Sequence, residues 1–209
     1  MANRAYKGTV FEREIAVALS RWWTNEDRED VFWRVGGSGG RARIRGRKGK
    51  NTVNQHGDIF AADPIGEPLM RLATIEVKKG YSARSIQDLL DHHLPTEKKK
   101  AAEQLYAEWI RKAEESQVQS GTYSWMLIVR RDQRRPLVLM PERLSDRLDT
   151  VMGFYMTFYD QKEVIIAYLL DDFFTYVKPD TIRSFIESYN WPASNIMHRS
   201  FLTKKLKKL

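Results

Sequence analysis

The spacing of apolar residues predicts a chain that alternates between helices and strands. Phe11, Ile15 and Leu19 recur every four residues, so residues 8–23 are expected to form an amphipathic helix. Short runs rich in β-branched and aromatic residues predict strands. The expected strands are residues 31–35, 58–62, 72–79, 123–131 and 137–140, and the further helices are 86–90, 96–117 with Thr96 as its N-cap, and 179–189. The apolar run at 164–170 fits either a strand or a buried helix.

Charged residues stand where two of these apolar runs begin or end. The segment 63–68 has the composition of a turn, so the strands on either side of it are expected to pair as a hairpin. Side chains alternate along a strand, which places Glu76 and Lys78 on one face, and the hairpin would bring Asp58 beside them. Two carboxylates with carbonyl or water oxygens suit a hard cation such as Mg²⁺. The alternative is a solvated Glu–Lys pair on a strand edge.

The net charge narrows the class of partner. The chain has 209 residues, a net charge of +8 and a sequence pI of about 9.6. This excess favours a polyanion, with nucleic acid as the first candidate and an anionic membrane surface as the second. No apolar run approaches the length of a membrane span, and the N-terminal residues lack the apolar core of a signal peptide. The absence of cysteine excludes disulfides and thiolate metal sites, and is consistent with a cytoplasmic protein.

Residues 36–51 concentrate positive charge without a single acid. The segment opens with Gly36-Gly37-Ser38-Gly39-Gly40, and glycine together with like charge disfavours independent folding. We interpret it as an arm that binds phosphates, and a solvated loop is the alternative. Its basic residues are Arg41, Arg43, Arg45, Arg47, Lys48 and Lys50.

Two motifs carry a family resemblance. Asp58 followed by Glu76-Val77-Lys78 resembles the PD-(D/E)XK nuclease superfamily, and residues 7–13, KGTVFER, are similar to the opening helix of archaeal-type Holliday junction resolvases. This implies an α/β, restriction-endonuclease-like core at residues 1–141, with a central mixed sheet flanked by helices. An aromatic-rich extension would follow at residues 142–209. The resolvase motif assigns Glu12 as a third acid, with Glu14 as its competitor.

The resemblance also implies roles for individual residues. Catalysis would fall to Glu12, Asp58, Glu76 and Lys78, and Mg²⁺, with Mn²⁺ as a substitute, would bind the three acids and the carbonyl of Val77. Contacts to DNA would come from the basic segment, from Lys79 and from Ser38, which resembles a Ser-Gly loop of the resolvases. His56 is either a phosphate or metal-water contact or an incidental turn residue.

The expected function is that of a metal-dependent DNA endonuclease on branched DNA. Resolvases cut two strands symmetrically, so a homodimer is expected, and the aromatic C-terminal region would serve as its interface or as core. The alternatives are a restriction-like or repair endonuclease on linear duplex, and a DNA-binding module that keeps the fold without catalysis.

Overall fold

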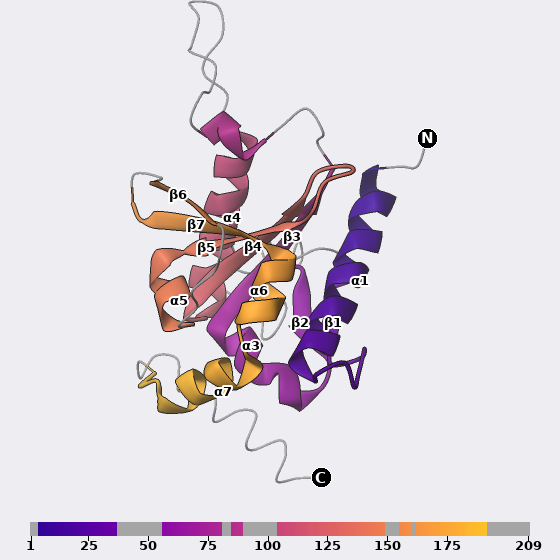
Figure 1. Cartoon of the computed structure of the whole chain (residues 1–209), viewed down its shortest axis with the longest axis vertical. Coiled ribbons are helices and arrows are strands. Elements are labelled where there is room, and N and C mark those ends of the chain that lie inside the picture. Colours follow the sequence, from indigo (N-terminus) through magenta and orange to yellow (C-terminus); the bar gives the residue numbers. More distant parts are fainter. Residues whose placement is uncertain are drawn as a thin grey trace, which may run out of the picture.

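The computed structural model describes residues 4–36, 56–80, 85–89, 104–148, 155–159 and 162–191. A mixed five-stranded sheet lies at its centre (Figure 1), in the order β3-β4-β5-β7-β6. Strands β3 and β4 are parallel, and every other neighbouring pair is antiparallel. The strands span Ala73–Lys79 (β3), Ser124–Arg130 (β4), Leu137–Pro141 (β5), Tyr155–Tyr159 (β6) and Val164–Leu169 (β7). The run that fitted either a strand or a helix is therefore a strand.

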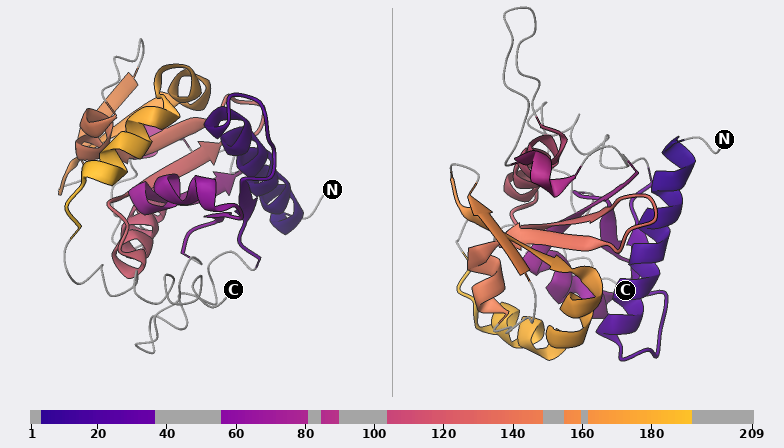
Figure 2. Two further views of the ribbon diagram at one scale, coloured as in Figure 1. Left: turned by 90° about the horizontal axis from the view of Figure 1, so that it is seen from below. Right: turned by 45° about the horizontal axis from the view of Figure 1, so that its top comes forward.

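Helices cover both faces of this sheet (Figures 1 and 2), as predicted. Helix α4 packs on one face through Tyr106, Trp109 and Ile110, and the other helices share the core on the opposite face. β4 is buried on both sides, which explains its nearly continuous apolar sequence. The helices span Arg4–Trp23 (α1), Glu67–Leu72 (α3), Leu105–Ser120 (α4), Glu142–Arg147 (α5), Leu170–Tyr176 (α6) and Pro179–Ser188 (α7). None of those described combines the length and apolar character needed to cross a bilayer.

The predicted hairpin between residues 58–62 and 72–79 is wrong. β2 (Ile59–Ala61) pairs antiparallel with β1 (Phe32–Arg34) in a separate two-stranded sheet. A short 3-10 helix and α3 separate β2 from β3. The Asp63 side chain accepts a hydrogen bond from the N–H of Ile65 at 3.0 Å, so this acid caps a helical turn that the composition had suggested was a strand-to-strand connection.

Two predicted helices also differ from the structure. Gln104 is extended, with ψ 138°, so α4 begins at Leu105 and does not run unbroken from Thr96, which lies outside the described residues. The helix ends at Gly121, whose φ of 70° is the left-handed conformation that glycine favours. The helix expected at 86–90 is a short 3-10 helix, Ile86–Leu89.

The aromatic residues after residue 141 contribute to the central fold. Strands β7 and β6 extend the same sheet beyond β5, so the predicted boundary at residue 141 falls between strands of one sheet. Phe173 is fully buried, and its ring lies 5.4 Å from that of Trp22 in α1. Tyr155 and Tyr159 are exposed on β6. The region thus supplies core residues together with an exposed aromatic strand.

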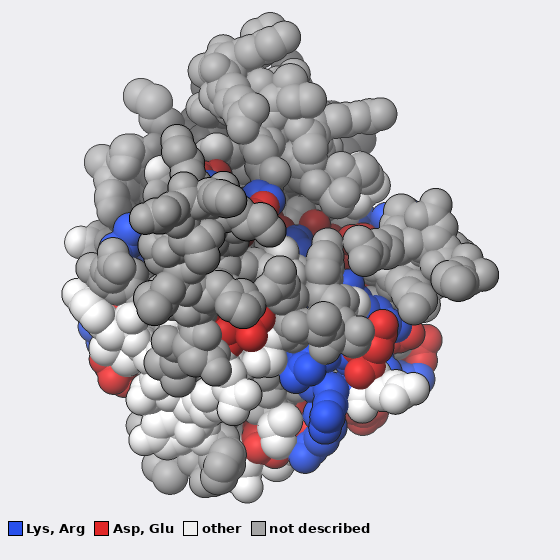
Figure 3. Space-filling model, turned by 90° about the horizontal axis from the view of Figure 1, so that it is seen from above, with Lys and Arg blue, Asp and Glu red and all other residues white. Residues whose placement is uncertain are grey.

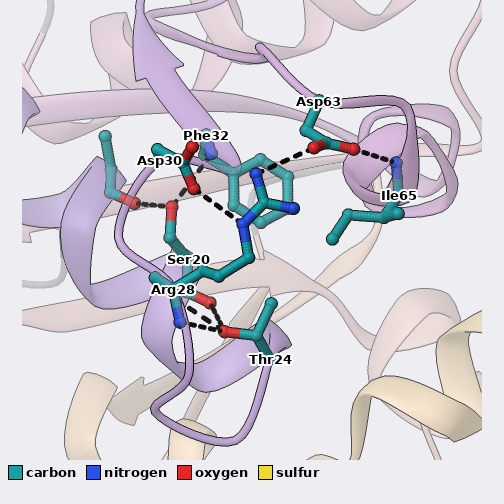
Figure 4. A network of polar contacts seen from close by, with 8 residues as sticks. Ser20, Thr24, Arg28, Asp30, Phe32, Asp63 and Ile65 are labelled. Carbon is teal, nitrogen blue, oxygen red and sulfur yellow. Dashed lines mark hydrogen bonds and ion pairs between the residues drawn. The ribbon is translucent and has the colours of Figure 1, made fainter.

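A polar network joins the end of α1 to the strands that follow (Figure 4). Arg28 pairs with Asp30 and with Asp63, each at 2.8 Å, and so connects the loop after α1 to the turn after β2. Beneath it, Ser20 is fully buried; its hydroxyl donates to the carbonyl of Ala16 at 2.8 Å and accepts from the N–H of Phe32 at 2.9 Å. These two hydrogen bonds of Ser20 hold the start of β1 against α1.

Replacing Ser20 with alanine should destabilise the fold. The N–H of Phe32 would lose its acceptor in a buried position, which costs about 1–3 kcal/mol. Urea unfolding of Ser20→Ala would measure this loss. Ser188→Ala is the matched control, because its hydroxyl is bonded to Phe185 at an exposed helix end. Equal stabilities of the two variants would contradict the role given to Ser20.

Candidate active site

Asp58 lies against the outer edge of β3, the terminal strand of the five-stranded sheet. Its backbone N–H donates to the carbonyl of Ile75 at 2.8 Å, and its Oδ2 accepts from the N–H of Val77 at 2.8 Å. These bonds use the groups that a neighbouring strand would otherwise pair with. They fix the carboxylate, in a residue only 2% exposed, next to the side chains of Glu76 and Lys78.

Lys78 connects Glu76 to Asp58 through a direct contact with each. The Nζ of Lys78 lies 2.7 Å from Asp58 Oδ2 and 2.6 Å from Glu76 Oε2, so the ammonium bridges the two carboxylates. The second oxygen of Glu76 accepts a hydrogen bond from Ser116 of α4 at 3.1 Å. The structure therefore brings these two acids and the amine together, by a route other than the expected hairpin.

Glu12 approaches from α1, and its ion-pair partner is Arg34 of β1. Nη1 of Arg34 lies 3.5 Å from Glu12 Oε2. Glu12 is 8% exposed, and burial, followed by the negative charge of Asp58, raises its pKa. The competing Glu14 is exposed and pairs with Arg130 at 3.2 Å.

Burial raises the pKa of both Glu12 and Glu76, and the charge of Asp58 raises each further. Lys78 lowers both, although not enough to cancel these effects. For Lys78 itself, burial lowers the pKa, but Glu76 and Asp58 outweigh burial and keep the pKa raised. The site thus combines a charged ammonium with two glutamates, Glu12 and Glu76, whose ionised forms are disfavoured by burial.

The oxygen donors at this point suit a hard divalent ion. Asp58 Oδ2 and Glu76 Oε2 already face one positive group, the ammonium of Lys78. Carboxylate oxygens are the ligands that Mg²⁺ takes in proteins. Over the described ranges, no three Asp, Glu or His side chains are grouped closely enough to be a metal site by themselves. Among the described residues, Asp58 and Glu76 thus offer a pair of carboxylate donors, and Glu12, which pairs with Arg34, is not grouped with them closely enough to make a three-ligand site.

The remaining predicted residues have varied positions. Val77 is buried, and its N–H is engaged by Asp58. Lys79 points away from Lys78, and its Nζ lies 5.6 Å from the centroid of the Phe11 ring. Of the predicted DNA-binding residues, those that lie outside the described residues are Ser38, Arg41, Arg43, Arg45, Arg47, Lys48 and Lys50.

The sequence analysis missed two residues that hold the acids. Arg34 contacts Glu12. Arg34 lies two residues after the buried Phe32 on a predicted strand, so both side chains point to the same face, and this position could have indicated a role for Arg34. Ser116 contacts Glu76, and it continues the buried stripe of α4 three residues after Ala113. A small polar residue within a buried stripe could have indicated a side-chain hydrogen bond.

Comparison with protein families identifies the family of this chain. A family model described as "Phage putative PDDEXK endonuclease" matches residues 3–184. The chain belongs to this family. No curated protein and no solved structure matches it. The match confirms the predicted PD-(D/E)XK superfamily, and the narrower resemblance to Holliday junction resolvases stays a prediction.

This member of the family has the restriction-endonuclease-like architecture that the resemblance implied, with a mixed sheet between helices. The matched residues include β6, β7 and α6, so the match to the family extends past β5. The family therefore contains the whole sheet, including the strands furthest from Asp58 and Glu76.

Replacing Gly57 with alanine should lower the stability and the activity of the protein more than the same change at Gly80. Both glycines have positive φ, +80° and +104°, but a Cβ at Gly57 would lie 2.6 Å from the carbonyl oxygen of Ile75, whereas nothing lies within 4 Å at Gly80. The clash would push Asp58 off β3. The positive φ costs both variants about 1–3 kcal/mol, and only Gly57→Ala adds the clash, so we expect Gly57→Ala to be the less stable variant and to lose cleavage. Denaturant unfolding and a nuclease assay test this, and equal behaviour of both variants would refute it.

The raised pKa of Glu12 predicts a pH-dependent stability difference. The ordinary pKa of a glutamate is 4.5, and as pH rises from there Glu12 loses its proton in the unfolded chain before it does so in the folded one. The folded state then holds more protons than the unfolded state, so its stability falls as pH rises. Glu12→Gln lacks this dependence. The free energy of unfolding of the wild type, relative to Glu12→Gln, should therefore decrease from pH 4.5 upward in urea titrations without divalent ions. A difference that grows with pH would contradict the shift.

Proposed function

We propose that this chain is a Mg²⁺-dependent DNA endonuclease that hydrolyses phosphodiester bonds in branched DNA, with Mn²⁺ as a substitute ion. The observation that carries the proposal is the convergence of Asp58 and Glu76 on one positive group, Lys78. A bound divalent ion would lower the pKa of a water and stabilise the charge that develops on the phosphate.

The residues around this point divide into three roles. Asp58 and Glu76 would hold the ion, with Glu12 and the carbonyl of Val77 as its further ligands. Lys78 gives up its bridging position and either orients the attacking water or neutralises the phosphate. Ser116 and Arg34 act as positioning residues, because each holds one carboxylate, Glu76 and Glu12 respectively.

Charge and motif support DNA as the substrate. The net charge of +8 favours a polyanion, and the basic residues 41–50 supply contacts to phosphates. The preference for a branch rests on the residues KGTVFER near the N-terminus. Cutting two strands symmetrically requires two active sites, so we propose that the endonuclease acts as a homodimer.

Cleavage of a synthetic four-way junction beside a linear duplex of the same sequence tests the proposal. With Mg²⁺ we expect paired nicks near the crossover, and with EDTA no nicks. Preferential cutting of the duplex would contradict the proposed preference for branched DNA and would identify linear duplex as the substrate. Binding of both DNAs without cleavage, unchanged in Glu76→Gln, would leave a DNA-binding module without catalysis.

A further inference from the structure

A second basic site lies at the end of β3 and β4, outside the cluster of Asp58, Glu76 and Lys78. A hollow of about 350 Å³ is lined by Lys79, Arg130, Asp132 and Gln133. It lies where the parallel strands β3 and β4 end, at the turn that joins β4 to β5. The N–H of Gly80 donates to the carbonyl of Arg130 at 3.0 Å and ties the two strand ends together.

The cations of this hollow are incompletely neutralised. Lys79 Nζ and Arg130 Cζ lie 5.6 Å and 5.7 Å from the centroid of the same ring, that of Phe11. Arg130 pairs with Glu14 through Nη1, but its Nε is buried without a hydrogen-bond partner. Lys79 has no ion pair with a carboxylate of the described residues. The ammonium of Lys79 therefore remains for an external acceptor, whereas the unmatched Nε of Arg130 is buried away from solvent.

The neighbouring turn adds positive charge. Residues 130–135 read RRDQRR, so four arginines accompany one acid, Asp132. The turn is closed by the bond from the N–H of Arg134 to the carbonyl of Arg131 at 3.1 Å. Figure 3 shows the molecule from above, where the visible lysine and arginine side chains lie beside acidic ones. Positive charge still exceeds negative charge when Asp132, Glu14 and Asp171, which pairs with Arg135, are counted against these cations, and this excess favours an anionic ligand.

We infer that this hollow binds a phosphate of the DNA backbone other than the phosphate that is cut, an inference that rests on the proposed function. Side chains alternate along a strand, so Lys79 and Lys78 lie on opposite faces of β3 and the hollow is separate from the cluster of Asp58, Glu76 and Lys78. The ammonium of Lys79 and the guanidinium of Arg130 are the groups that would contact this phosphate. The site positions the DNA and carries no base specificity.

The salt dependence of DNA binding, measured in EDTA so that no cleavage occurs, tests this site. Removal of one phosphate contact reduces the slope of log Kd against log salt by about 1, so Lys79→Gln should show this reduction. Gln133→Glu leaves every cation in place but adds a negative charge to the hollow, and should weaken binding at low salt. Lys178→Gln is the matched control, because Lys178 lies between α6 and α7 and donates to the carbonyl of Thr175.

Each outcome bears on a separate claim. An unchanged slope in Lys79→Gln, or unchanged affinity in Gln133→Glu, overturns the phosphate site, and so does a slope change of equal size in Lys178→Gln. The expected changes in a protein that never cleaves DNA with Mg²⁺ would support the phosphate site while refuting the catalytic proposal. Thermal melting of each variant separates these effects from unfolding.

Discussion

Asp58→Asn is expected to reduce DNA cleavage by at least about 10³-fold. The amide keeps an oxygen that can accept from the N–H of Val77, so the geometry at β3 survives, but the charge that faces Lys78 is gone. Stabilisation by a divalent ion contributes several kcal/mol to such reactions, and each 1.36 kcal/mol is a factor of ten in rate. Single-turnover cleavage at saturating Mg²⁺ measures the loss.

The matched control for this variant is Asp171→Asn. Asp171 is exposed and pairs with Arg135 at 3.0 Å, so the same chemical change occurs away from the site. Its cleavage rate should equal that of the wild type, and both variants should still bind DNA in EDTA. A cleavage rate within tenfold of the wild type in Asp58→Asn would remove Asp58 from the catalytic residues.

Lys78→Met should bind divalent ions more tightly than the wild type and yet cleave DNA poorly. The ammonium forms hydrogen bonds with the same two oxygens that an ion would use, at 2.7 and 2.6 Å. An ion on these oxygens would therefore compete with the ammonium. Hydrogen bonds to charged groups contribute about 1.5–3 kcal/mol, so removal of this competitor should raise affinity about tenfold or more. Calorimetric titration with Mg²⁺ or Ca²⁺ gives the affinity independently of activity.

Lys79→Met is the appropriate comparison for that titration. It removes the same charge one residue along β3, from a side chain that lies over Phe11 and not between the carboxylates. Its affinity for the ion should stay near that of the wild type. If Lys78→Met binds the ion no better than Lys79→Met, the ammonium does not occupy the position of the ion.

The sequence predicted the parts of the site that depend on local pattern. The alternation along β3 correctly placed Glu76 and Lys78 on one face, and the apolar repeat of α1 located the helix that carries Glu12. Both follow from the regular geometry of a single element. The family match then confirmed the superfamily that these residues resemble.

The parts that were missed depend on contacts between distant segments. A short run such as residues 59–61 gives no indication of its partner, and Asp63-Pro64 initiates a helical turn as readily as a hairpin. β2 consequently pairs with β1, and Asp58 reaches β3 through two hydrogen bonds of its own. The partners of Arg34 and Ser116, which are Glu12 and Glu76, are defined only after α1, β1, β3 and α4 are packed together.

The bonds between Asp58 and β3 have a consequence for solubility. An unpaired strand at the border of a sheet can recruit another polypeptide and start aggregation. Here the N–H of Val77 and the carbonyl of Ile75 are already occupied by Asp58. A side chain without an oxygen at position 58 would leave the N–H of Val77 open to another chain. Selection for a monodisperse protein would thus retain an acceptor at this position even in a relative that had abandoned hydrolysis.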